Sequence, residues 1–337
     1  MSNIQDVAKL SGVSVATVSR TLNNPEVVSE KTRKKVLKVV EEINYYPDSL
    51  AKNFRTRKTY MIVVLVPDIA NPFFSRVIRG IQNTAHLNNY SILLGDTQSQ
   101  ISIEESYAKM VIAKQADGII QLSAHFPLKD EMLKRYSHEK LPIVNICECL
   151  DGDIVPTIQL DNIGAAKTMT SHLIELGHKH IGVVTGPAKS PLTKDRLAGY
   201  RLALEEAGLS FDDNLIRTGD FSVKSGRDTA DEFLGMSQVP TSVFCFNDEM
   251  AMGVCQRFKE AGISVPEYIS VAGFDDINFA SLHSPSLTTI RQPAEEIGKA
   301  AALQLYNILR GIPPSERHIV FPFDLITRDS TGPARKS

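Results

Sequence analysis

The sequence predicts a small all-α head followed by an α/β body made of two lobes with parallel sheets. Two short helical patterns flank Gly12 near the N-terminus, and from Tyr60 onward buried-type strands alternate with helix-length segments. A length of 337 residues also exceeds one ordinary core. We therefore expect four parts: a head at 1–47, a linker at 48–59, a body at 60–330 and a tail at 331–337.

The head begins with two predicted helices. Their apolar faces are Ile4, Val7, Ala8 and Leu10 in the first and Val15, Val18 and Leu22 in the second. Gly12 tolerates the positive φ of a tight break, and Ser14 offers a hydroxyl that can cap the second helix. The outward face of the second helix carries short side chains and one guanidinium: Val15, Ala16, Thr17, Ser19 and Arg20.

This arrangement is typical of a helix-turn-helix, whose second helix enters the DNA major groove. Arg20 can bond guanine O6 and N7, while Val15 and Ala16 can pack on thymine methyl groups. Thr17 and Ser19 would contact phosphates. On geometry alone, a helical hairpin from an ordinary core explains the pattern equally well.

A third helix is expected after Ser29, and Pro47 should end it. Its apolar positions are Val36, Val39, Val40 and Ile43. We expect Tyr45 and Tyr46, which follow, to pack in the core of the head.

The run DVAKLSGVSVATVSRTLNN resembles the head of the LacI/GalR (lactose/galactose repressor) family of bacterial transcription regulators, and the resemblance extends over essentially the whole chain. It implies a cytoplasmic homodimer, most often a repressor, that binds a palindromic operator under control of a small effector. The chain ends at STGPARKS without the leucine heptads of tetrameric relatives, which favours a dimer. The remaining DNA-contacting candidates are Asn23, Leu50, Ala51, Phe54 and Arg55.

The linker DSLAKNFRTRKT is too short to be a stable helix alone. The resemblance implies that it becomes a hinge helix on the operator, where relatives insert a leucine into the minor groove. Phe54 stands at that position, and an aromatic ring can also wedge between base steps. Docking of Phe54 on the body is the alternative.

Charge separates the head from the body. Residues 1–60 hold 11 Lys and Arg against 6 Asp and Glu, a net +5, whereas the remainder holds 26 against 33, a net −7. A basic head on an acidic body is expected when only the head meets phosphate. A solvated basic helix would explain the lysines of the third helix alone.

Composition is ordinary for a soluble globular protein, with 42% hydrophobic and 23% charged residues, and reduced cysteines would suit a cytosolic chain. Neither a leader nor an apolar run of about eighteen residues is present. The cysteines lack the further ligands of a zinc site, so we expect reduced core thiols and neither metal nor cofactor. They are Cys147, Cys149, Cys245 and Cys255.

The body contains seven buried-type runs, predicted as parallel strands with helices on both faces. They are 61–67, 90–96, 117–123, 141–146, 180–186, 241–247 and 269–275. Polar residues follow these runs at the carboxyl ends, where open α/β sheets bind ligands. This pattern resembles the periplasmic-binding-protein fold. The expected lobes are 60–161 with 292–322 and 162–291 with 323–330, with crossings near Asp161, Thr289–Arg291 and Phe321–Asp324.

The resemblance implies an effector site between the lobes. Aromatic candidates are Phe73, Phe74 and Phe221, and polar candidates are Asp161, Arg196, Asn247, Asp275 and Gln292. Helix capping by Asp161, core packing of one Phe and a surface ion pair of Arg196 are the structural alternatives. Arg, Asn and Asp around an apolar cleft suit a neutral ligand with several hydroxyl groups.

Ser190 and Leu192 stand where purine-responsive relatives carry arginine and threonine, which disfavours a purine base. The segments VPDIANPFF, LLGDT and GPAKSPL resemble the cytidine-repressor branch most. A pyrimidine nucleoside such as cytidine is therefore the favoured effector, and a sugar is second.

Two other classes of protein fit the sequence less well. An enzyme is disfavoured because the chain lacks a dinucleotide-binding G-x-G-x-x-G, a Walker loop and a G-x-S-x-G elbow. His178 and His180 lie at a predicted helix-to-strand turn, where solvated side chains are expected. A solute-binding protein used for transport would share the two lobes, but it should carry an export signal and no basic head.

Overall fold

In the computed structural model the chain divides into two units, residues 1–59 and 60–337. Within them, the structure describes residues 3–46, 58–128, 142–148 and 155–335. The positions predicted at Leu50, Ala51, Phe54 and Arg55, and Cys149, lie outside these described residues.

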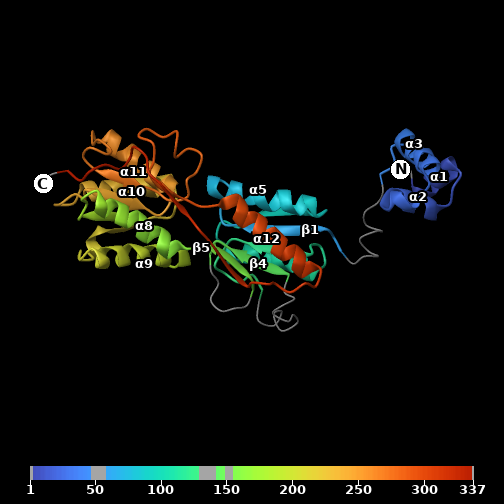
Figure 1. Ribbon diagram of the computed structural model, residues 1–337, viewed down its shortest axis with the longest axis horizontal. Helices are drawn as coiled ribbons and strands as arrows, with labels where there is room; N and C mark the ends of the chain where they lie inside the picture. The colour runs from blue at the N-terminus through green and yellow to red at the C-terminus, as the bar shows by residue number, and fades with distance from the viewer. Residues whose placement is uncertain (1–2, 47–57, 129–141, 149–154, 336–337) are drawn as a thin grey trace. The chain divides into compact units, whose positions relative to one another are not determined.

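The first unit is a bundle of short helices (Figure 1). Its elements are α1 (Ile4–Ser11), α2 (Val15–Asn23), the 3₁₀ turn η1 (Pro25–Val27) and α3 (Glu30–Glu42). Val7, Val18 and Val36 are fully buried at its centre. Gly12 has a φ of 61° after α1, and the Ser14 hydroxyl accepts the backbone N–H of Thr17 at the start of α2. Both local predictions are therefore confirmed.

Three predictions for the head are wrong. α3 ends at Glu42 and not at Pro47, because Asn44 takes a left-handed φ of 46° soon after it. Leu10 is 59% exposed, because the helical repeat from Val7 leads to Ser11, which is buried and donates its hydroxyl proton to the Val7 carbonyl at 2.6 Å. Tyr46 is 83% exposed, whereas Tyr45 is buried as expected. The two tyrosines are adjacent in non-helical backbone, so they point in different directions.

The first lobe of the body (lobe 1) contains a six-stranded parallel sheet in the order β11-β5-β4-β3-β1-β2. Its strands are β1 (Met61–Val66), β2 (Ser91–Asp96), β3 (Gly118–Gln121), β4 (Ile143–Ile146), β5 (Thr157–Leu160) and β11 (His318–Phe321), and its described helices are α5 (Pro72–Leu87), α6 (Ile101–Ile112) and α12 (Ala294–Leu309). α5 and α12 pack side by side (Figure 1). A Cβ on Gly80 would collide with the Glu295 carbonyl, so glycine allows this close approach.

The second lobe (lobe 2) contains a four-stranded parallel sheet in the order β7-β6-β8-β9. Its strands are β6 (Ile181–Thr185), β7 (Ile216–Thr218), β8 (Ser242–Cys245) and β9 (Ser270–Ala272), and its helices are α8 (Asn162–Glu175), α9 (Pro191–Glu206), the 3₁₀ turn η3 (Asp213–Leu215), α10 (Val223–Leu234) and α11 (Asp248–Glu260). Helices pair as α8 with α9 and α10 with α11. The predicted parallel sheets are therefore observed in both lobes.

An antiparallel pair, β10 (Thr289–Arg291) with β12 (Asp324–Ile326), lies where the chain passes between the lobes. A side-chain contact also joins the two lobes. Arg76 of α5 donates from Nη1 to the backbone oxygen of Asp276 at 3.2 Å. Asp276 in turn accepts bonds from Arg291 at 2.7 Å and Arg328 at 2.6 Å. Hydrogen bonds from Arg76, Arg291 and Arg328 therefore hold Asp276 at the connection between the lobes.

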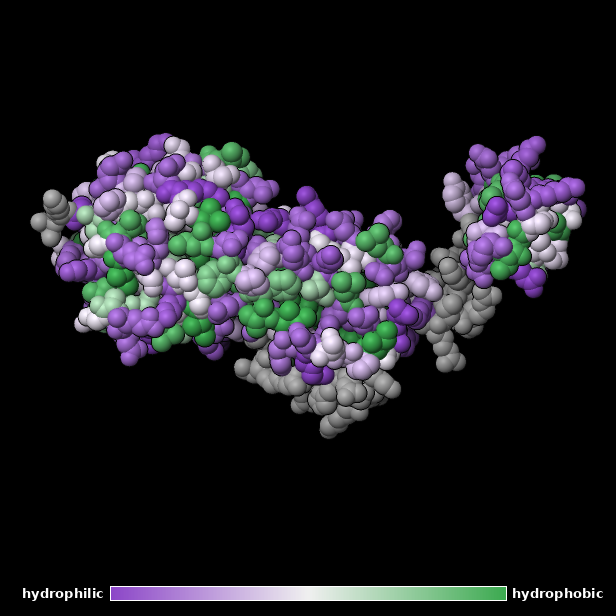
Figure 2. Space-filling model, viewed as in Figure 1, coloured by the Kyte–Doolittle hydropathy of each residue, from purple (hydrophilic) through white to green (hydrophobic). Residues whose placement is uncertain are grey.

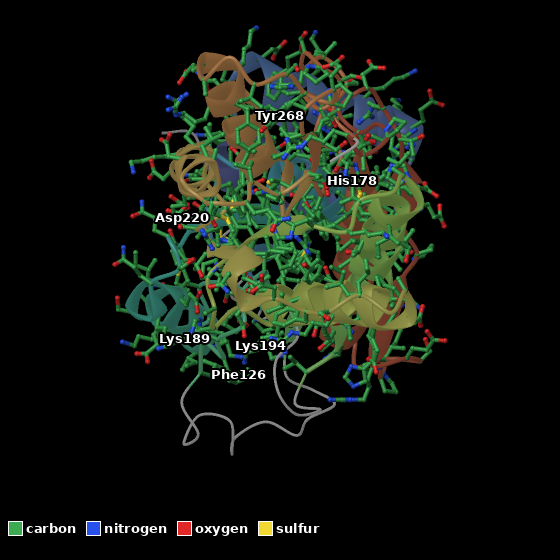
Figure 3. The ribbon with its side chains drawn as sticks, turned by 90° about the vertical axis from the view of Figure 1, so that its left-hand side faces the viewer. Phe126, His178, Lys189, Lys194, Asp220 and Tyr268 are labelled. Carbon is green, nitrogen blue, oxygen red and sulfur yellow. The ribbon has the colours of Figure 1, made fainter. Side chains whose placement is uncertain are left out.

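The histidine prediction is wrong for His178. This side chain is buried in lobe 2, and its ring nitrogens bond Thr241 at 2.9 Å, Ser270 at 3.1 Å and the Gly332 carbonyl at 3.0 Å. The C-terminal segment covers the helix-to-strand turn, which removes His178 from water. Figure 3 labels His178, Tyr268 and Asp220 in a view from the end of the body that lobe 2 forms.

Figure 2 shows hydrophobic residues gathered near α12 on the face of the body that it draws, and Leu303 of α12 is 40% exposed. Cys147, Cys245 and Cys255 are free and buried, in agreement with the predicted core thiols. Within the described ranges, no helix combines the length and the apolar character needed to cross a membrane.

Candidate functional site

The outward face of α2 is the candidate DNA-contacting surface. Val15 is 41% exposed, Ala16, Arg20 and Asn23 are also exposed, and Thr17 and Ser19 are half-buried. Burial of Val18 and Thr21 fixes the opposite face in the core, so this row points outward. Asn23 is the last residue of this row, and its side-chain amide donates to the Ser19 carbonyl of the same helix at 2.8 Å.

Arg196 of α9 is the centre of the candidate effector site. It is 3% exposed, and its Nε donates to Asn162 Oδ1 at 3.0 Å while Nη1 donates to the Phe246 carbonyl. Its guanidinium carbon lies 3.5 Å from the centre of the Phe274 ring, a cation–π contact. Because guanidinium has five N–H donors, these two bonds leave donors for a ligand. A surface ion pair, the structural alternative, does not describe this buried residue.

Asp275 and Gln292 form a hydrogen-bonded pair near Arg196. Gln292 Nε2 donates to Asp275 Oδ1 at 2.6 Å, and both side chains are buried. Burial raises the pKa of Asp275 to about 6, against the lowering influence of Arg196 and of the Gln292 bond. The backbone of Asp275 has a φ of 114°, which is sparsely populated by non-glycine residues and marks a constrained position.

Asn247 positions Phe221. Its Oδ1 accepts the Met250 N–H at the start of α11 at 2.9 Å, and its Nδ2 donates to the Phe221 carbonyl at 2.8 Å. Phe221 has a φ of 70°, and its ring lies so close to Gly186 that a Cβ there would collide with it. The structure therefore gives Asn247 a supporting contact with Phe221.

The other candidates lie in the core, at a helix cap and at the start of α9. Phe73 is buried in the core. Its ring packs edge-on against the half-buried Phe74, with 5.4 Å between the ring centroids. Asp161 is exposed and caps α8 by accepting the Gly164 N–H at 2.8 Å. Ser190 and Leu192 are half-buried at the start of α9.

Glu148, which follows β4, was not among the sequence candidates. Ser190 Oγ donates to its Oε1 at 3.5 Å, joining lobe 1 to lobe 2. Burial raises the pKa of Glu148 to about 7, opposed by Arg196 and Ser190. The sequence signal for Glu148 is a charged residue soon after a buried strand. Because Glu148 stands between Cys147 and Cys149, the interpretation of this segment concerned only the two thiols.

Glu249 at the start of α11 is a second acidic residue that sequence reasoning missed. Burial raises its pKa to about 7, and repulsion from Asp275 and from Asp68 of lobe 1 adds to the effect. Asp275 therefore interacts both with Glu249 and with Arg196, which the Glu148 carboxylate of lobe 1 also influences. In the part of the chain that the structure describes, no group of three or more His, Cys, Asp or Glu side chains could hold a metal.

Comparison with known proteins identifies both units. Residues 3–48 match the family described as bacterial regulatory proteins, lacI family, and residues 170–331 match the periplasmic binding protein-like domain. The HTH-type transcriptional repressor CytR of Escherichia coli strain K12 is 38% identical over 98% of this chain and 96% of its own length. The HTH-type transcriptional regulator RegA of Clostridium saccharobutylicum is 35% identical over 98% and 99%.

Solved structures agree. A lac repressor dimer bound to operator and the anti-inducer ONPF matches with a TM-score of 0.86 at 28% identity, over 98% of this chain and 99% of that chain. A complex of the transcriptional regulator CelR with cellobiose matches with a TM-score of 0.73 at 28% identity, over 98% and 100%. With a lacI-type head, a periplasmic-binding-protein-like body and regulators that align along nearly its full length, this chain belongs to the LacI family of DNA-binding transcription regulators.

Proposed function

We propose that this chain acts as a homodimeric repressor whose affinity for a palindromic operator is set by a small effector bound between the two lobes. The observation that carries the effector site is buried Arg196, with free N–H donors and with Asp275 of lobe 2 and Glu148 of lobe 1 near it. A cation held there without a close ion pair among the described residues is suited to polar ligand groups.

On the DNA side, Arg20 would read a guanine and Val15 and Ala16 would contact thymine methyl groups, with phosphate contacts from Thr17, Ser19 and Asn23. In the linker, Leu50, Ala51, Phe54 and Arg55 would add contacts at the operator centre. The exposure of Val15, Ala16, Arg20 and Asn23 on α2 supports the contacts proposed for that helix.

Among effectors we favour a nucleoside such as cytidine. Phe221 offers a ring for stacking, Arg196 and Asp275 offer groups for hydroxyls, and the relatives include a repressor named CytR. A sugar is the second candidate, because a structural match contains cellobiose.

Effector occupancy would favour one arrangement of the lobes. Contacts such as Ser190 with Glu148 and Arg76 with the Asp276 carbonyl join the lobes, so a ligand that binds one arrangement better shifts the dimer toward it.

The experiment is fluorescence anisotropy of labelled operator with the full-length protein, with and without nucleosides and sugars. Arg20→Ala should lose specific binding by about 1–3 kcal/mol while effector affinity stays unchanged. Lys38→Ala on α3, whose side chain pairs with Glu42, is the control and should retain specificity. If Arg20→Ala still distinguishes the operator from random duplex, the proposed role of α2 is refuted.

A second measurement tests the effector half of the proposal. Thermal unfolding of the intact dimer should rise with one class of compound, because ligand binding stabilises the folded state. If no nucleoside or sugar changes either the unfolding midpoint or operator affinity, the proposed cleft has no such effector.

A further inference from the structure

The body begins at a residue with an unusual backbone conformation. Tyr60 is the first residue of the second unit and directly precedes β1, and its φ is 57°. L-amino acids rarely adopt this left-handed conformation, and a bulky aromatic residue there is an outlier. Because the linker joins the body at Tyr60, the backbone angles of this residue decide the direction in which residues 58 and 59 leave β1.

Hydrogen bonds from neighbouring strands hold the backbone of Tyr60. Its N–H donates to Asp117 Oδ2 at 3.0 Å, and its carbonyl oxygen accepts the N–H of Ser91 at 2.9 Å. Ser91 begins β2 and Asp117 directly precedes β3, and these are the two strands that flank β1 in the sheet. The bonded groups belong to the peptides before and after the Tyr60 Cα, so together they restrict both backbone angles of this residue.

The position of Asp117 is fixed in turn. Its N–H donates to the Met61 carbonyl at 2.8 Å, and its neighbour Gly118 is the register partner of Ile62. A hydrogen bond to a carboxylate is roughly twice as strong as one between neutral groups. Asp117 therefore ties the N–H of Tyr60 to the hydrogen-bond ladder between β1 and β3.

The ring of Tyr60 is also held by lobe 1. Its centroid lies 5.6 Å from that of Tyr90, and the Tyr90 ring packs edge-on against Tyr306 of α12 with 6.3 Å between centroids. Tyr90 is 6% exposed, so the row of rings continues into the core of the lobe. Aromatic pairs at such distances contribute stability beyond the area that they bury. These contacts offset the cost of the left-handed backbone at Tyr60.

A comparison within lobe 1 separates Tyr60 from ordinary turns. Asn89, with a φ of 60°, and Lys114, with a φ of 59°, also have left-handed backbones, but both are exposed polar residues just after helices, where this conformation is common. Tyr60 instead starts a strand. A sparsely populated conformation that several contacts enforce is typical of sites where backbone geometry serves function.

We propose that Asp117 and Tyr90 hold Tyr60 so that the linker leaves lobe 1 in one direction, and that this junction of three residues sets the spacing of operator half-sites that the dimer accepts. The inference rests on the proposed function, because it needs operator binding through the head and linker. Two linkers that start in fixed directions favour one separation of half-sites, whereas freely rotating linkers accept several. A fixed start also reduces the entropy that is lost on binding, so the junction strengthens operator affinity.

The test measures fluorescence anisotropy of labelled duplexes with the full-length dimer. One duplex carries the operator, and two others carry the same half-sites moved about one base pair closer together or farther apart. Tyr60→Gly can adopt the same φ without strain but lacks the ring, so the linker can leave in several directions. Operator affinity should fall about tenfold, and the preference for the operator over the two altered spacings should fall about threefold.

Two further variants complete the test. Asp117→Asn keeps the shape and one acceptor oxygen but removes the charge, so operator affinity should fall only about threefold. Asn89→Gly places glycine at another left-handed residue of the same lobe, away from the linker, and is the control. It should keep the affinity and the spacing preference of the parent.

Thermal unfolding shows whether each variant is folded, and if Tyr60→Gly does not fold, Asp117→Asn carries the test. If the parent binds no palindromic duplex, the proposed function fails and this inference fails with it. If the parent binds an operator and the folded variants keep its affinity and spacing preference, only this inference is overturned, and the junction serves to start β1. An equal loss in Asn89→Gly also overturns the inference, because general destabilisation of lobe 1 is then the cause.

Discussion

The two walls of the proposed effector site differ in how their polar groups are satisfied. In lobe 2, Asn247 is bonded at both ends of its amide, Asp275 accepts from Gln292, and Arg196 is held by Asn162 and Phe246. In lobe 1, the buried side-chain oxygens of Glu104, Gln121 and Asn145 have no hydrogen-bond partner at bonding geometry among the described residues. The polar side chains of lobe 2 are therefore fixed by hydrogen bonds, whereas those of lobe 1 are less completely paired.

This difference suggests a division of labour. A wall whose side chains are already fixed loses little conformational entropy when a ligand arrives, which favours affinity. A wall of unpaired buried acceptors discriminates strongly, because a ligand that lacks matching donors leaves them unpaired. We expect substitutions in lobe 2 to change affinity for all effectors and substitutions in lobe 1 to change preference among them.

The largest effect is expected for Arg196→Met, which preserves the apolar stem and removes every N–H donor. Charged hydrogen bonds contribute about 1.5–3 kcal/mol each, so affinity should fall at least about 100-fold for every effector. Calorimetry measures the loss, and operator anisotropy should be unchanged. Arg201→Met on the same helix, where the side chain lies over Phe211, is the control. A loss confined to one class of effector would contradict the division between the walls.

Glu148→Gln should give an intermediate effect that depends on pH. The pKa of Glu148 is raised to about 7, so the folded protein holds its proton more tightly than the unfolded chain does. The contribution of the Glu148 carboxyl to the free energy of unfolding is therefore greatest below pH 4.5, and it falls as the pH rises toward 7. The variant should remove that fall, raising the unfolding midpoint relative to the parent by roughly 2–5 °C at pH 8 and less at pH 5.

The groups that face Glu148 and could alter this result are Arg196, Ser190 and Glu104. Glu249→Gln is the comparison: its pKa is also about 7, but its acidic neighbours are Asp275 and Asp68. Both variants should flatten the pH dependence of the midpoint, and only Glu148→Gln should alter effector preference. Parallel curves for parent and Glu148→Gln between pH 5 and 8 would exclude a raised pKa at Glu148.

A smaller loss is expected for Asn247→Asp. A carboxylate can still cap α11 through the Met250 N–H, but it cannot donate to the Phe221 carbonyl. Release of Phe221 from its left-handed backbone conformation should weaken every effector about three- to tenfold. The ratio of cytidine to uridine affinities should not change. A changed ratio would move Phe221 from a general stacking role to one in selection.

The sequence predicted what depends on neighbouring residues. Gly12, Ser14 and the valines of the head act through local backbone geometry, and the hydrophobic runs of the sheets are visible one strand at a time. It failed where distance along the chain matters. β11 pairs with β5 although about 160 residues separate them, and neither is a long apolar run. His178 was assigned to solvent because Gly332, whose carbonyl bonds it, lies 154 residues further along the chain.

The site shows the same limit. Arg196, Asp275 and Phe221 were named through family resemblance, but nothing local indicated that Asn247 supports Phe221 or that Gln292 bonds Asp275. Glu104 left no signal at all, since a glutamate on an amphipathic helix is expected to face water. Its burial follows from packing α6 over β3 and β4, a tertiary effect.

The smallest expected effect concerns Thr193, the exception in the lobe 2 wall. It lies three residues before Arg196 on α9, hence on the same face, and its buried hydroxyl has no partner within the described residues. Thr193→Val removes an unpaired hydroxyl at constant shape, so the ligand-free protein should unfold a few degrees higher. If the hydroxyl bonds the effector, affinity should fall about three- to fivefold, and calorimetry should detect it for every effector. Unchanged affinity would show that the Thr193 hydroxyl does not bond the effector.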